Sequence, residues 1–113
     1  MASAPRVTLM YKELRYLGKN YEIVKPIYVE VAASRDDDGV IYCMTVVDLN
    51  NELIFGIGRT SRQARRLLRK LLVDYYETLM SCDLNNYSGS ENHIYGLDRD
   101  TLKGSIHKNE SSA

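Results

Sequence analysis

The chain has 113 residues, with 15 basic and 15 acidic side chains and a formal net charge of zero. A chain of this length forms one domain around one core. No apolar run approaches the roughly 20 residues that cross a bilayer, and Met1 to Arg6 lack the apolar segment of a secretory signal, so we expect a cytoplasmic protein with no membrane partner. Cys43 and Cys82 have no metal-ligand or disulfide spacing, which predicts reduced thiols and no metal site.

Three strands are predicted in the middle of the chain. Apolar residues alternate over Ile27–Ala33, the period of a half-buried strand. Ser34–Gly39 is a polar loop that ends in glycine, and Val40–Leu49 is rich in β-branched and aromatic residues, which predicts a hairpin. The pair Asn50–Asn51 tolerates the left-handed conformation of a tight turn, so Glu52–Ile57 is expected to be the third strand.

A long helix is expected next, over about Ser61 to Met80, because this segment contains neither Gly nor Pro. Thr60 or Ser61 can accept hydrogen bonds from the free amides of its first turn. Steps of about 100° per residue bring apolar side chains to one face of the helix, and that face must pack on the sheet. This face consists of Ala64, Leu68, Leu71, Leu72, Tyr75 and Leu79.

The fold class predicted from these elements is α+β, a three-stranded antiparallel sheet with one long helix packed on one face. Residues 1–26 form an N-terminal extension, in which Thr8–Leu17 is either a short helix or an extra strand that runs into Tyr21–Val24. After Ser81 the composition shifts to Asn, Ser, Gly, Asp and Lys, so residues 81–113 are expected to be a disordered tail with at most a transient helical turn near Thr101–Ile106.

The second predicted strand is apolar on both sides, and one helix can cover only one face of the sheet. Either residues Val7 to Val24 or a second copy of the chain must then shield the other face, because an exposed apolar face and edge would aggregate. We expect a homodimer. The two alternating sets are Tyr42, Met44 and Val46 on one side and Ile41, Cys43 and Val47 on the other.

Several patterns that can carry chemistry have a structural explanation here. The run Asp36–Asp38 lacks the alternate spacing and closing Glu of a calcium loop, and fits a solvated hairpin. His93 and His107 lie in the predicted tail, where nothing would hold a tautomer. Gly56 and Gly58 are too few for a dinucleotide fingerprint, and are expected to let the helix turn back over the sheet. No nucleophile, base and orienting group come together, so we expect neither an enzyme nor a cofactor.

Six cations surround the helix start with no acid among them. The N-terminal end of the helix macrodipole favours acids, so each of these cations costs a few tenths of a kcal/mol, and an anionic partner explains their presence. The alternative is a solvated face balanced by Asp36–Asp38 or by the acidic tail. The predicted binding residues are Arg59, Arg62, Arg65, Arg66, Arg69 and Lys70.

The middle of the chain resembles the HicB-like antitoxin fold, a βββα unit described as a partial, non-catalytic relative of ribonuclease H. The resemblance spans Ile27 to Glu77 and implies a protein partner, typically an RNA-cleaving toxin, and dimerisation through the sheet. It rests on four short motifs: Asp36–Gly39 (DDDG), Val47–Leu49 (VDL), Gly58–Ala64 (GRTSRQA) and Tyr75–Glu77 (YYE).

A second resemblance is to the double-stranded-RNA-binding domain, an α-β-β-β-α unit. It would use Thr8–Leu17 as the first helix and Pro26–Tyr28 at the start of the first strand, with Gly56–Gly58 and Thr60–Arg65 at the glycines and basic helix start. It implies that the same six cations contact phosphates of structured RNA, although the Asp36–Asp38 loop would repel them. The sequence thus predicts a binding module whose partner is a protein or, alternatively, RNA.

Overall fold

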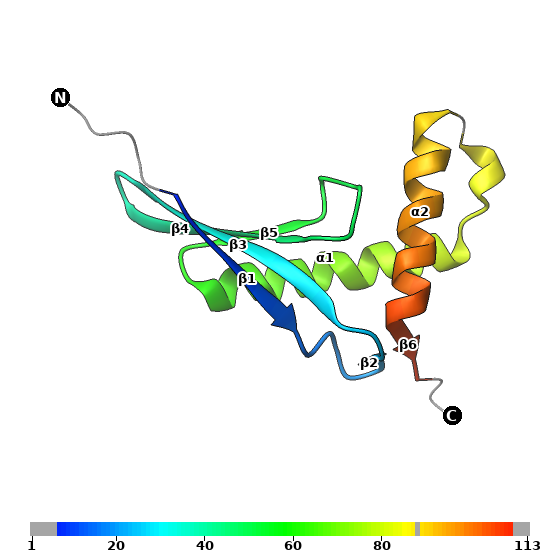
Figure 1. Ribbon diagram of the computed structural model, residues 1–113, viewed down its shortest axis with the longest axis horizontal. Coiled ribbons are helices and arrows are strands. Elements are labelled where there is room, and N and C mark those ends of the chain that lie inside the picture. The colour runs from blue at the N-terminus through cyan, green and yellow to red at the C-terminus, as the bar shows by residue number, and fades with distance from the viewer. Residues whose placement is uncertain (1–6, 88, 110–113) are drawn as a thin grey trace.

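The computed structural model describes residues 7–87 and 89–109, and it shows an α+β fold (Figure 1). A four-stranded antiparallel sheet has the order β1-β3-β4-β5, and a separate two-stranded sheet pairs β2 with β6. The strands are β1 (Thr8–Leu14), β2 (Tyr21–Ile23), β3 (Ile27–Asp36), β4 (Gly39–Val46), β5 (Phe55–Gly58) and β6 (Ile106–Lys108). The helices are α1 (Ser61–Ser81), the 3-10 turn η1 (Leu84–Asn86) and α2 (Ser90–Ser105).

The predicted meander of three antiparallel strands is present as β3, β4 and β5, with different ends. β3 continues to Asp36, so Asp37 and Asp38 alone form the turn, and Gly39 follows with a φ of 121° that favours glycine. The second connection is longer than predicted, because β4 ends at Val46 and β5 begins at Phe55. Within the described residues only glycines have positive φ, so the left-handed turn expected at Asn50–Asn51 is wrong.

The N-terminal segment supplies a fourth strand, which corrects the predicted three-stranded sheet. Of the two alternatives for Thr8–Leu17, the strand is the one observed: β1 pairs antiparallel with β3, from Thr8 opposite Ala33 to Leu14 opposite Ile27. β1 therefore satisfies the backbone groups of β3 that would otherwise be a free edge. Residues 1–6 of the predicted extension lie outside the described residues.

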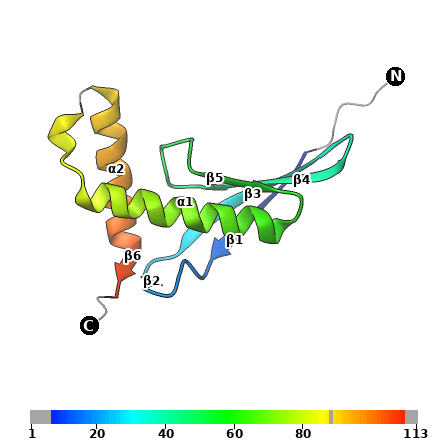
Figure 2. The same cartoon turned by 180° about the vertical axis from the view of Figure 1, so that it is seen from behind.

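α1 begins where predicted and packs across β5 and β4 (Figure 2). Thr60 and Gln63 form a capping box, in which the Thr60 hydroxyl accepts from the Gln63 amide and the Gln63 side chain accepts from the Thr60 amide. Of the predicted apolar face, every residue is buried except Leu71, which is only half-buried. Tyr76, which was not predicted, is buried in addition.

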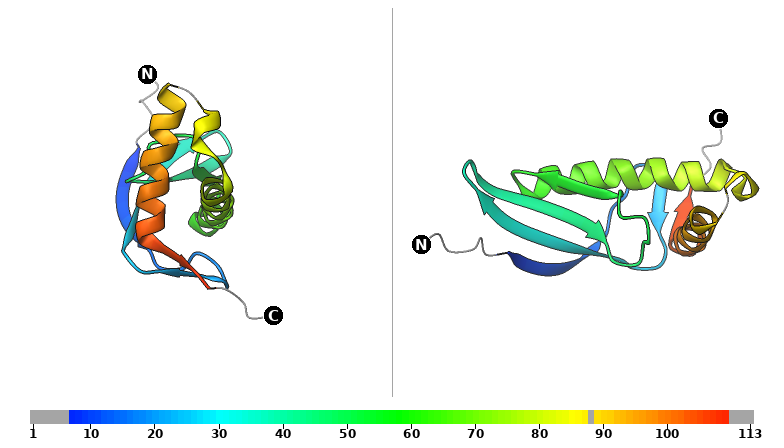
Figure 3. Two further views of the ribbon diagram at one scale, coloured as in Figure 1. Left: turned by 90° about the vertical axis from the view of Figure 1, so that its right-hand side faces the viewer. Right: turned by 90° about the horizontal axis from the view of Figure 1, so that it is seen from above.

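The predicted disordered tail is wrong over most of its length. Residues 84–108 form η1, α2 and β6, and α2 crosses the C-terminal end of α1 (Figures 1 and 3). Leu102 and Ile106 are buried in the core, and Ile106 pairs with Ile23 in the small sheet. Two well-placed apolar residues therefore anchor a segment whose average composition is polar. Residues 88 and 110–113 of the predicted tail lie outside the described residues.

Candidate binding surfaces

The cations predicted on the helix fall on one side of α1, which we term the basic helix surface. Of its five residues, Arg65 and Arg69 are half-buried, and the other three are exposed. None of the ion pairs within residues 7–87 and 89–109 involves any of the five. The basic helix surface consists of Arg62, Arg65, Arg66, Arg69 and Lys70.

Arg59, the sixth predicted cation, is held elsewhere. It precedes the helix, and its Nη1 lies 2.7 Å from Oδ1 of Asp36, with Nη2 3.8 Å from Oδ2 of Asp38. The hydrogen bond from Arg59 holds the pKa of Asp36 below its usual value. The acidic hairpin thus balances the charge of Arg59, and we leave this residue out of the basic helix surface because it precedes α1.

One residue that the sequence did not single out lies beside the basic helix surface, and a further cation on β1 projects to the same side of the sheet. The guanidinium carbon of Arg69 lies 5.3 Å from the ring centroid of Tyr16, a cation–π contact that joins α1 to the segment after β1. Lys12 on β1 pairs with Val29, which is buried on the α1 side of the sheet, so Lys12 projects toward the same side as α1. Helical periodicity could not find either residue, because both lie outside α1, Lys12 on β1 and Tyr16 in the segment that follows it.

A buried carboxylate ties α2 to the connection between β4 and β5. Asp98 is 0% exposed, and its two oxygens accept four hydrogen bonds. The donors are the Asn50 amide at 2.7 Å, the Asn50 side-chain amide at 3.1 Å, the Asn51 amide at 3.0 Å and the Tyr75 hydroxyl at 2.7 Å. Burial and the bond to Asp98 raise the pKa of Tyr75. With four donors in place, Asp98 holds the fold together, and its position explains why residues 47–54 form a loop.

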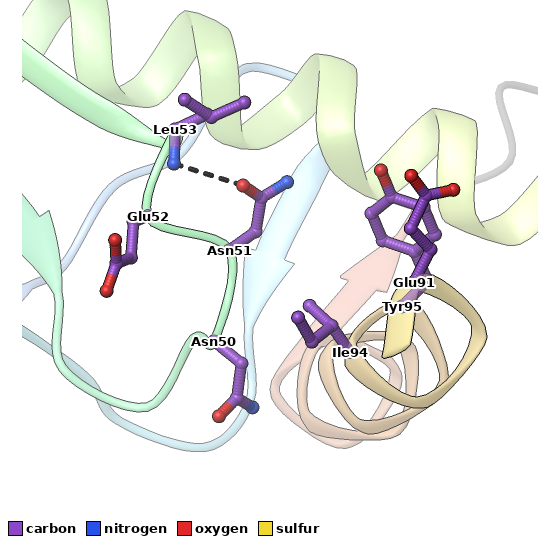
Figure 4. A pocket seen from close by; sticks show the side chains of 7 residues that line it. All are labelled: Asn50, Asn51, Glu52, Leu53, Glu91, Ile94 and Tyr95. Carbon is purple, nitrogen blue, oxygen red and sulfur yellow. Dashed lines mark hydrogen bonds between the residues drawn. The ribbon is translucent and has the colours of Figure 1, made fainter. Parts of the chain in front are cut away.

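A cleft of about 330 Å³ lies beside this junction, between the β4–β5 connection and α2 (Figure 4). The side chains around it come from Asn50 to Leu53 on one side and from Glu91, Ile94 and Tyr95 on the other. A smaller cavity of about 150 Å³ shares Asn51 and Tyr95 with it. His93 and His107 are exposed, on α2 and β6, and neither lines these two cavities.

Comparison of the chain with protein-family models, with curated proteins and with solved structures finds no match. The two resemblances therefore rest on the residues quoted for them. Along the chain, the strand at Thr8–Leu14 comes first, and β3, β4, β5 and α1 follow one another. Neither helix in the described ranges has the length and apolar character required to span a membrane.

Proposed function

We propose that this protein is a non-catalytic, antitoxin-like binding module of the cytoplasm that recognises an acidic surface of a protein partner through the basic helix surface. The observation that carries the proposal is the set of five cations on the first half of α1, with no ion pair to the described part of the chain. The helix macrodipole disfavours cations there, so stability alone does not account for them.

A protein partner is favoured over RNA by what surrounds the cations. Tyr16 is 56% exposed, and its ring centroid lies 5.3 Å from the guanidinium carbon of Arg69. Arginine and tyrosine are both typical of the centre of a protein interface. RNA, the second candidate, would use the cations only, and the pair between Arg59 and Asp36 places the acidic hairpin close to the helix start, where it repels phosphates.

The direct test is to purify the full chain from its native host under moderate salt, with and without ribonuclease, and to identify what copurifies. The informative variant reverses Arg62, Arg66 and Arg69 to Glu, and we expect it to lose a stoichiometric protein partner that survives ribonuclease. A matched control reverses three exposed lysines outside the basic helix surface, and should retain that partner. The control residues are Lys19, Lys25 and Lys103.

Salt dependence separates the two partner classes. A protein complex with apolar contacts weakens only mildly with salt, whereas an RNA complex that neutralises several phosphates loses orders of magnitude in affinity between low and physiological salt. If structured RNA copurifies and its affinity falls steeply with salt, then the partner is RNA and not a protein. If the charge-reversed variant retains everything that wild type retains, the basic helix surface is only solvated and the proposal is wrong.

A further inference from the structure

The four-stranded sheet has one covered and one open face. Met10, Val31, Met44 and Gly56 are mutual neighbours across the four strands, and the last three are buried beneath α1. Side chains one position along each strand point to the opposite side, which we term the open sheet face. The segment Val7 to Val24, expected as one possible cover, instead forms the edge strand β1 and the partner of β6. Within the described ranges the helices lie on the α1 side and at one end of the sheet (Figure 3).

The strand register determines where large and small side chains lie on the open sheet face. One row across the four strands consists of Leu9, Ala32, Cys43 and Ile57. The two central residues are small, whereas Leu9 and Ile57 on the edge strands are large and are 55% and 45% exposed. In the next row the edge residues are again large, Tyr11 and Phe55. The centre of this second row is polar, with Glu30 and Thr45. The face therefore has a short apolar centre at Ala32 and Cys43, a carboxylate beside it at Glu30, and longer apolar or aromatic side chains along both edges.

The charges on this face limit what can cover it. The strand residues that point to it include Glu13 and Glu30, which neighbour Tyr28 and Tyr11, and none of the strand residues there is a Lys or Arg. Arg15, which follows β1, pairs with Glu13 at 3.0 Å, whereas none of the ion pairs in the described residues involves Glu30. Arg59 follows β5, but it is already engaged by Asp36. A second copy of the chain packed face to face would bring a second Glu30 and no Lys or Arg from its strands, and a buried charge without a partner is strongly destabilising. The occupant must therefore supply a cation for Glu30, and a further cation beside Glu13 would add to the one that Arg15 provides.

We propose that the open sheet face binds an amphipathic α-helix of a protein partner, with apolar residues toward Ala32 and Cys43 and with Lys or Arg toward Glu13 and Glu30. Four strands spaced by about 4.8 Å span about 14 Å between the edge strands, which accommodates one helix about 10 Å wide between the longer edge side chains. The bound helix would complete a helix–sheet–helix sandwich, the usual way to cover both faces of a sheet. This site is separate from the basic helix surface.

Cys43 reports whether the centre of the face is covered, and Cys82 at the end of α1 is an internal control, because both thiols are free and half-buried. We would measure alkylation of each cysteine in the full chain by mass spectrometry, with either of two synthetic peptides of about 18 residues, or five helical turns. Both carry the same leucine stripe, flanked by Lys in one and by Glu in the other. The Lys peptide should slow alkylation of Cys43 about tenfold more than the Glu peptide does, with Cys82 unaffected.

A charge swap tests the role of the carboxylates. The variant with Glu13→Lys and Glu30→Lys should prefer the Glu peptide, whereas Glu22→Lys, at an exposed position of β2 outside both surfaces, should leave the wild-type preference unchanged. The single variant Glu13→Lys, at an exposed position, serves if the double variant does not fold, and should at least weaken the preference. Equal protection by both peptides, or by neither, overturns the proposal. So does a dimer in sedimentation whose Cys43 is protected without peptide, because a second copy then occupies the face.

Discussion

The two halves of α1 are held in place by different interactions. The N-terminal half lies directly on β5, where Ala64 and Leu68 are both 0% exposed and Gly56 brings the strand close to the helix backbone. The C-terminal half meets α2 and the β4–β5 connection through the Tyr75 hydroxyl and the buried carboxylate of Asp98. Both halves bury apolar side chains, including Leu72 and Leu79 in the C-terminal half. The N-terminal contact depends in addition on a missing side chain, and the C-terminal contact depends on a satisfied polar group. The first contact joins neighbours in sequence, whereas the second joins segments 23 to 48 residues apart.

The largest effect is expected from Gly56→Ala, which acts on the N-terminal contact. A Cβ at this position would lie 1.8 Å from the backbone oxygen of Ala64 and 2.8 Å from the backbone nitrogen of Leu68. Since both are backbone atoms, no rotamer change relieves the clash, and the helix must move off the strand. We expect a loss of more than about 4 kcal/mol in the free energy of unfolding, measured by urea denaturation. A midpoint close to wild type would show that the N-terminal contact is loose.

The next effect is expected from Asp98→Asn, which acts on the C-terminal contact. The substitution preserves shape, but it turns an amide group toward two of the four donors, so at least one buried donor loses its acceptor. We expect a loss of about 3 kcal/mol, together with faster hydrogen exchange at the Asn50 and Asn51 amides. Asp100→Asn, at an exposed position of α2, is the matched control and should be near neutral. A near-neutral Asp98→Asn would mean that apolar packing alone holds α2.

Alkaline pH should weaken the C-terminal half of α1 before the N-terminal half. Burial and the hydrogen bond to Glu77 raise the pKa of Tyr21 to about 12, and the pKa of Tyr75 is also raised above the ordinary value of about 10. Folding favours the protonated forms, so their stabilisation is complete below about pH 10 and is lost as the pH rises through the folded-state pKa values. Above about pH 10, tyrosine absorbance measures the ionisation of these hydroxyls, and hydrogen exchange measures the loss of stability in each half of α1.

The variants Tyr75→Phe and Tyr21→Phe sharpen the alkaline experiment. Each removes one ionisable hydroxyl, so each should flatten the loss of stability above about pH 10, while lowering stability at neutral pH by about 1 kcal/mol through the lost hydrogen bond. Two results would contradict the conclusion that Tyr21 and Tyr75 cause the alkaline loss of stability. One is unfolding that begins at the N-terminal half of α1, and the other is an alkaline stability profile that neither variant alters.

The smallest effect, of opposite sign, is expected from Gly104→Ala in the last turn of α2. A Cβ there meets nothing within 4 Å, so the substitution differs from Gly56→Ala only in its surroundings. Alanine reduces the freedom of the unfolded chain and favours the helix, and we expect a gain of about 0.5 kcal/mol by urea denaturation. A loss would indicate that the C-terminal end of α2 must open in the folded protein.

The sequence alone determined the elements whose evidence lies within a few residues. The alternation over Ile27–Ala33 and the helical period after Thr60 predicted β3 and α1, and the helix bounds agree to one residue. Five of the six predicted cations fall on one side of α1, because their spacing is itself helical. Local geometry fixes such patterns before any tertiary contact forms.

Only the tertiary structure decided the remaining features. Thr8–Leu14 is a strand through its pairing with β3. The segment after α1 is held by buried Leu102 and Ile106 and by Asp98, which accepts from the amides of Asn50 and Asn51, about 48 residues earlier. Arg59, one of the predicted binding residues, pairs with Asp36, which only the fold of the hairpin brings within 2.7 Å. In each case the deciding partner is distant in the chain, and composition or periodicity over a short window carries no information about it.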